Sequence, residues 1–225
     1  MSTPRTIMRT DKEYPVVLQN RLGVAAPAQL YAIGNASALQ RSLLGLICSI
    51  KCPGSIILKT FDAVRALRDK GVTMIGGFLS PMERDCLDIL LRGKQPIILC
   101  PARTILGLRL GNEARKAIDD HRLLVLSPFD ESVRHTTTAQ AVWRNNLVAA
   151  LAKALFVPHA APGGKTWSTV KAALKRNQPV FTFDVPDNAE LLDSGARPFE
   201  LLFEQADSQK RKPINSLDVN EGEYE

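Results

Sequence analysis

Between residues 43 and 184 the chain alternates six short apolar runs with longer segments of helical character. One connecting segment carries Phe61, Val64 and Leu67 at helical spacing and ends at Gly71. Strands that are apolar throughout are buried on both faces, and helix-length connections between them give parallel pairing. The pattern therefore predicts an α/β fold with a doubly wound, mostly parallel, Rossmann-like sheet and helices on both faces. The apolar runs are 43–50, 72–76, 96–100, 123–127, 154–159 and 179–184.

The chain divides into three segments by pattern and charge. Residues 1–40 are predicted to be an N-terminal extension that packs on the sheet, with a short strand at 30–34. Residues 41–203 form the expected Rossmann-like domain. Residues 204–225 hold six acidic and three basic side chains without helical or strand period, which predicts an acidic, flexible tail. Because the whole chain carries +6, the part before this tail carries +9, and a basic body favours a polyanionic ligand.

Several features indicate a cytoplasmic protein without membrane association. The N-terminus lacks the apolar core of a signal peptide, and no apolar run approaches the roughly 20 residues of a membrane helix. Four cysteines (Cys48, Cys52, Cys86 and Cys100) lie in or beside apolar segments, as reduced thiols do. Their closest spacing, Cys48-x3-Cys52, is not the CxxC of structural zinc sites, so neither a metal nor a cofactor is expected.

Ligands of a doubly wound sheet bind at the carboxyl ends of its strands, where loops lead into helices. Four such loops, 49–54, 76–84, 101–104 and 162–166, contain glycine pairs or cationic side chains. Paired glycines allow close approach to a phosphate, and free amides at a helix start complement its charge. An isolated glycine pair can equally be a plain turn, and each cation an ordinary surface residue. The candidate phosphate- or nucleic-acid-binding residues are Lys51, Gly76, Gly77, Ser80, Arg84, Arg103, Gly163, Gly164, Lys165 and Thr166.

Four motifs carry a family resemblance: Tyr14-Pro15 through Gly34-Asn35, the Gly76-Gly77 loop through Glu83, the segment 143–151 (WRNNLVAAL), and the loop 162–166. Together they resemble the DprA/Smf family of DNA-processing proteins, within a superfamily that includes LOG-like nucleotide-binding proteins. The chain departs from the family pattern at Ile50, where Arg is usual, at Glu83 in place of Asp, and at Asn146 in place of the second Arg of the helix.

The resemblance implies binding rather than catalysis. DprA-like proteins bind single-stranded DNA in a basic pocket at this sheet edge and hand it to a RecA-like recombinase, often as homodimers. On this basis Arg144 and Asn145 join the candidate contacts. Phe78 and Trp167 lie in or beside the glycine loops and could either stack on bases or pack into the core.

Two other functions remain open from the sequence. A LOG-like nucleoside-monophosphate phosphoribohydrolase would use Glu83 as its carboxylate, but Val170 stands where the PGGxGTxxE element of such enzymes has its acid. A sensor of a nucleotide-derived messenger would use the same phosphate-binding loops without chemistry. The basic body favours single-stranded DNA over both, since a mononucleotide needs only a few cations.

Overall fold

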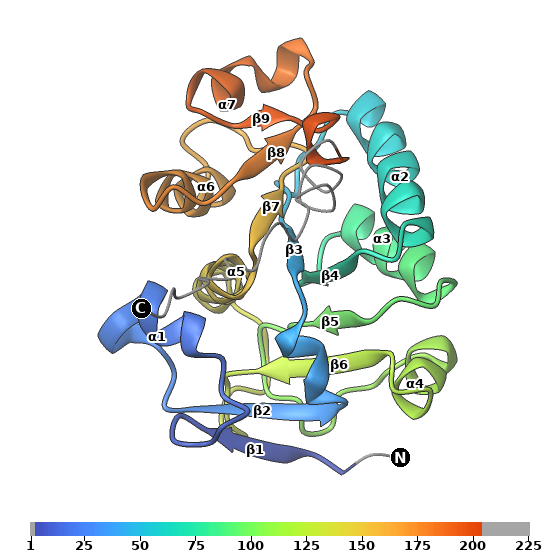
Figure 1. The fold of residues 1–225 in the computed structure, drawn as a ribbon, viewed down its shortest axis with the longest axis vertical. Helices are drawn as coiled ribbons and strands as arrows, with labels where there is room; N and C mark the ends of the chain where they lie inside the picture. Colours follow the sequence, from blue (N-terminus) through green and yellow to red (C-terminus); the bar gives the residue numbers. More distant parts are fainter. Residues whose placement is uncertain (1–2, 204–225) are drawn as a thin grey trace, which may run out of the picture.

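The computed structural model describes residues 3–203, which form one nine-stranded sheet between two layers of helices (Figure 1). The order across the sheet is β1-β2-β6-β5-β4-β3-β7-β8-β9. The predicted tail, 204–225, lies outside the described residues. The strands are β1 (Arg5–Met8), β2 (Gln29–Gly34), β3 (Leu43–Leu46), β4 (Thr73–Gly76), β5 (Ile97–Leu99), β6 (Leu123–Ser127), β7 (Ala154–Phe156), β8 (Val180–Thr182) and β9 (Arg197–Pro198).

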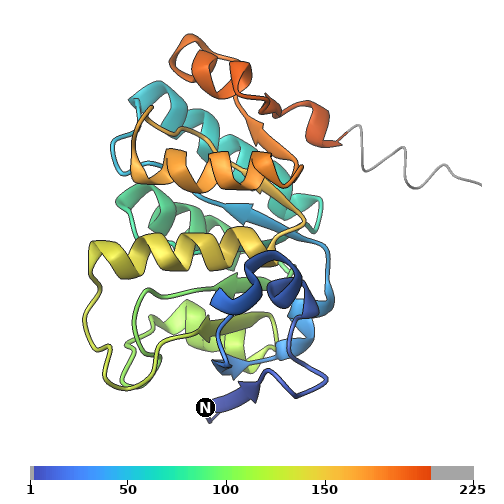
Figure 2. The ribbon, with the colours of Figure 1, turned by 90° about the vertical axis from the view of Figure 1, so that its left-hand side faces the viewer.

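Helices cover both faces of the sheet, each over its own apolar core. In Figure 1, α2, α3 and α4 lie on one side, while α1, α5 and α6 lie on the other and face the viewer in Figure 2. None of the helices in residues 3–203 is long and apolar enough to cross a membrane. The helices are α1 (Val16–Leu22), α2 (Gly54–Asp69), α3 (Pro81–Leu91), α4 (Asn112–Asp119), α5 (Thr138–Leu151), α6 (Lys165–Lys175) and α7 (Ala189–Asp193), with 3-10 turns at Gly23–Ala25, Ala36–Gln40 and Pro186–Asn188.

The strands from β3 to β9 are mutually parallel, which confirms the predicted fold class. From β3 the chain adds β4, β5 and β6 on one side and then returns to add β7, β8 and β9 on the other. The order reverses between β3 and β7, and this switch point is where doubly wound sheets bind ligands. The position of a ligand site in this fold is therefore expected beside the neighbouring strands β3 and β7.

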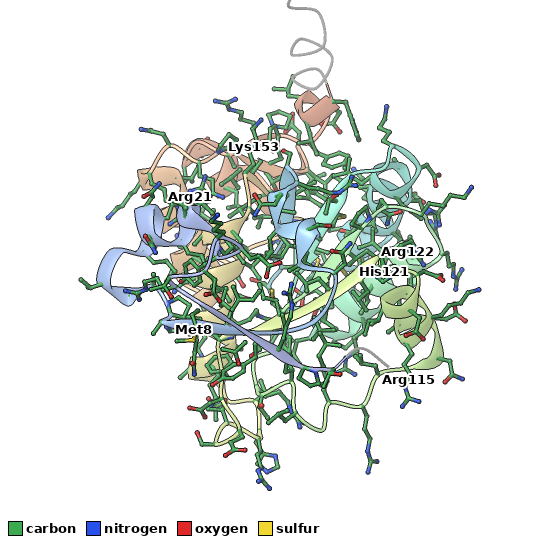
Figure 3. All side chains as sticks on the ribbon, turned by 60° about the horizontal axis from the view of Figure 1, so that its bottom comes forward. Met8, Arg21, Arg115, His121, Arg122 and Lys153 are labelled. Carbon is green, nitrogen blue, oxygen red and sulfur yellow. The ribbon has the colours of Figure 1, made fainter. Side chains whose placement is uncertain are left out.

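The first forty residues add two antiparallel strands to the same sheet. β1 pairs with β2, and β2 pairs with β6 so that Tyr31 lies opposite Ser127. α1 packs on α5, and Arg21 from α1, labelled in Figure 3, donates hydrogen bonds to the carbonyls of Ala150 and Ala152 near the end of α5. Burial lowers the pKa of Arg21. These contacts anchor the N-terminal elements to the sheet's α5 face.

Candidate functional site

The loops after five neighbouring parallel strands line the carboxyl edge of the sheet. They are, in sheet order, 157–164, 47–53, 77–80, 100–111 and 128–137. At the switch point the first two loops are joined directly. The Ser49 amide donates to the His159 carbonyl at 3.0 Å, and the Ala161 amide donates to the Ser49 hydroxyl at 3.1 Å. The four loops predicted from the sequence therefore share one edge, and the loop after β6 continues it.

Two helices begin at the switch point without a side-chain cap. α2 follows Pro53 and α6 follows Gly164, and neither of these residues can offer a side-chain oxygen to the first amides of the helix. The N-terminal amides of a helix have no partner within it, and they carry the positive end of the helix dipole. These two helix starts, one on each side of the strand-order reversal, favour an anion between them.

Two cationic side chains lie beside these helix starts. Lys51 and Lys165 are exposed, and neither forms an ion pair with any acid in residues 3–203. Gly163 is also exposed, has φ of +71°, and has open space where a Cβ would stand. Gly164, in contrast, has no room for a side chain, since a Cβ there would lie 2.9 Å from the Ala161 carbonyl oxygen. Thr166 is buried, and the exposed residues of this loop are Pro162, Gly163 and Lys165.

The glycines of the loop after β4 accommodate side chains of the protein itself. A Cβ on Gly76 would lie 3.0 Å from the Phe78 ring, and a Cβ on Gly77 would lie 1.1 Å from Nη1 of Arg144. Phe78 is buried in the core, with φ of +46°. Of its two sequence-based interpretations, core packing is the one the structure shows. This glycine pair thus serves close packing beneath the edge, whereas Gly163 lies open at it.

Arg144 is a buried cation that joins three parts of the site. Its side chain on α5 packs against Gly77 and donates from Nη1 to the Cys100 carbonyl at 3.0 Å, while the residue is only 3% exposed. Burial lowers the pKa of Arg144, and the nearby carboxylate of Glu83 opposes that shift. Its Nε atom is buried without a hydrogen-bond partner in residues 3–203. Arg144 therefore holds the loops after β4 and β5 against α5, and Asn145 beside it is half-buried.

Glu83 is buried and closes the start of α3. With Ser80 it forms a capping box, and its Oε2 accepts hydrogen bonds from the amides of Leu79 at 3.0 Å and Ser80 at 3.2 Å. Its Oε1 accepts from the Cys48 amide at 3.4 Å and so reaches the loop after β3. The carboxylate proposed for the hydrolase alternative is thus engaged by three amides. Arg84, the next residue, is exposed and donates to the Leu79 carbonyl.

The four cysteines are free thiols. Hydrogen bonding between the Cys48 and Cys52 thiols raises the pKa of Cys48 and lowers that of Cys52. Burial raises the pKa of Cys86 and of Cys100 to about 12 each. Within residues 3–203 no group of three or more His, Cys, Asp or Glu side chains is arranged to hold a metal ion.

A cavity of about 360 Å³ lies farther along the edge, between the loops after β5 and β6. Arg103 in this cavity has a buried Nε without a partner in the described chain, while Arg134 is exposed. Sequence reasoning missed Arg134 because its loop has no glycine pair. The sequence feature that could have identified Arg134 is that it is a cationic residue in the segment after an apolar strand, 123–127, whose end lies at the same edge. The lining residues are Arg103, Thr104, Leu106, Gly107, Glu131 and Arg134.

The fold and this edge define a class: a Rossmann-like α/β protein with a cationic carboxyl edge at the switch point of its sheet. The family model of the DNA recombination-mediator protein A matches residues 5–202. The chain therefore belongs to that family, which places it among the DNA-processing proteins.

Solved structures of two DNA processing proteins share this fold. DNA processing protein A from Helicobacter pylori is 18% identical, with a TM-score of 0.71 over 93% of this chain and 99% of that chain. The protein from Streptococcus pneumoniae is 18% identical, with a TM-score of 0.72 over 86% of this chain and 70% of that chain. No curated protein matches the sequence. At this identity the structures show a common fold.

Proposed function

We propose that this protein binds single-stranded DNA at the carboxyl edge of its sheet and does so without catalysis. The observation that carries the proposal is the pair of exposed lysines, Lys51 and Lys165, beside two uncapped helix starts at the switch point. Unpaired cations and free amides together bind phosphate groups. Among the other sequence candidates, Arg84 and Arg103 are proposed to act as further cations. Arg144 and the Gly76-Gly77 pair, together with Glu83, are proposed to support the loops beneath them.

The length of the cationic edge favours a polymer over a mononucleotide. Cations follow five adjacent strands, from Lys165 after β7 to Arg134 after β6. With neighbouring strands about 4.8 Å apart, this row extends over about 20 Å. One phosphate group occupies only a small part of that length. Several phosphates of one flexible strand can occupy it together, which favours DNA over a nucleotide-derived messenger.

The relatives support the same ligand. The H. pylori protein is described as binding single-stranded DNA, and this chain shares its fold along nearly its whole length. We extend the proposal to the partners that the family resemblance implies: a RecA-like recombinase that receives the DNA, and a second copy of this chain. The free thiols agree with a cytoplasmic location.

The proposal is tested by measuring the affinity of the full chain for labelled oligothymidine and for a duplex of equal length, at several salt concentrations. We expect tighter binding of the single strand. We also expect log K to fall with log salt by about 0.7 for each phosphate neutralised. Binding without dependence on salt, or without preference for the single strand, would contradict the proposal.

A further inference from the structure

Three exposed aliphatic side chains stand on consecutive loops of the proposed DNA-binding edge. Ile50 is 82% exposed after β3, Leu79 is 37% exposed after β4, and Leu106 is 45% exposed after β5. Because β3, β4 and β5 are neighbours in the sheet, these loops lie side by side. Single exposed apolar residues are common on protein surfaces, but three on adjacent loops of one edge form a row.

Each of these side chains has a cation close to it. Ile50 precedes Lys51 in the chain, the Arg84 side chain donates to the Leu79 carbonyl at 3.0 Å, and Leu106 lines one cavity with Arg103 and Arg134. A surface that alternates aliphatic and cationic groups matches a chain that alternates apolar faces with phosphates. An unpaired nucleic-acid strand has this composition.

The backbone beneath the row is held in place. The Leu79 amide donates to the Glu83 carboxylate at 3.0 Å, and the Ser49 amide, next to Ile50, donates to the His159 carbonyl. A surface that is already ordered loses less conformational entropy when it binds a ligand. Phe78 and Trp167, the aromatic residues that the sequence suggested for stacking on bases, do not form part of this row, because Phe78 is buried and Trp167 packs on the core.

We infer that Ile50, Leu79 and Leu106 contact the faces of unstacked bases and give this edge its selectivity for single strands over duplex. The inference rests on the proposed function and adds its specificity-determining residues. In a duplex the base faces are stacked on one another and cannot reach these side chains, while the phosphates of both forms can reach the cations. Burial of aliphatic surface against a base contributes a term that does not depend on salt.

The test replaces Ile50, Leu79 and Leu106 together by serine and measures affinity for oligothymidine and duplex. We expect single-strand binding to weaken by about tenfold or more, with duplex binding and the salt slope unchanged. The matched control replaces Val16, Val24 and Leu58, which are exposed on or beside α1 and on α2, and is expected to bind as wild type does. Since Ile50 is largely exposed, Ile50→Ser serves as a second variant with little risk to folding, and it should show part of the loss.

A further variant is expected to increase the affinity for the single strand instead of lowering it. Ile50→Trp places an aromatic ring at the same position and is expected to tighten oligothymidine binding severalfold, since aromatic rings stack on bases. Wild-type selectivity in the triple and Ile50→Ser variants would overturn the inference and leave the proposed function standing. A wild-type protein that fails to bind oligothymidine would overturn both.

Discussion

Replacing Lys51 and Lys165 together by alanine is expected to weaken oligothymidine binding by more than roughly tenfold at low salt. The two exposed ammonium groups stand beside the uncapped starts of α2 and α6, so their loss removes positive charge from both sides of the switch point. The plot of log K against log salt should become less steep, its slope smaller in magnitude by about 1.4, because two phosphates lose their partners. Fluorescence anisotropy at several salt concentrations measures both quantities.

The matched control changes the net charge equally at the opposite edge. Lys94 precedes β5 and Lys175 ends α6, and both are exposed. The Lys94→Ala, Lys175→Ala double variant is expected to keep nearly the wild-type affinity and slope. If the two double variants weaken binding equally, the effect comes from overall charge and the switch point is not the binding site.

Gly77→Ala is expected to destabilise the fold by about 3 kcal/mol, the scale of a severe steric conflict in a packed interior. The added methyl would occupy the position of the Arg144 guanidinium, 1.1 Å from Nη1. Either the loop after β4 or the buried arginine must then move, and displaced Arg144 loses its hydrogen bond to the Cys100 carbonyl. Urea unfolding followed by circular dichroism measures the change in the free energy of unfolding.

Gly54→Ala is the control for that substitution. Gly54 begins α2, nothing lies within 4 Å of a Cβ built there, and alanine suits a helix, so stability should stay the same or rise slightly. A double-mutant cycle locates the conflict: in an Arg144→Ala background, Gly77→Ala should cost much less. An equal cost in both backgrounds would show that Arg144 is not the group displaced.

The fold could be predicted from sequence because its six central strands are apolar throughout and its helices keep a clear period. The boundaries differed at β3 and β7, which were expected to be 43–50 and 154–159 and end at Leu46 and Phe156. Ile47, Cys48 and Val157, which follow directly, are buried loop at the switch point, and burial alone does not distinguish such a loop from a strand; Ile50, by contrast, is exposed. The strand β1 and helix α1 were missed because both are short, and α1 owes much of its position to packing on α5.

The candidate site was predictable in position but less so in the roles of its residues. Parallel strands bring their loops to one edge, so the sequence could place Lys51 and Lys165 together. It could not distinguish the Gly76-Gly77 pair, whose free space is filled by Phe78 and Arg144, from the open Gly163, because the difference depends on distant residues. The same holds for Glu83, whose bond to the Cys48 amide spans two loops.

Photo-cross-linking to oligothymidine, with the linked peptides located by mass spectrometry, identifies the segments of the chain that contact the DNA. We expect cross-links in 47–53 and 158–166, with further ones in the loops that hold Arg103 and Arg134. Excess unlabelled oligothymidine should suppress them. Cross-links confined to the opposite edge, around Arg122 and Lys153, which directly precede β6 and β7 and are labelled in Figure 3, would contradict this expectation.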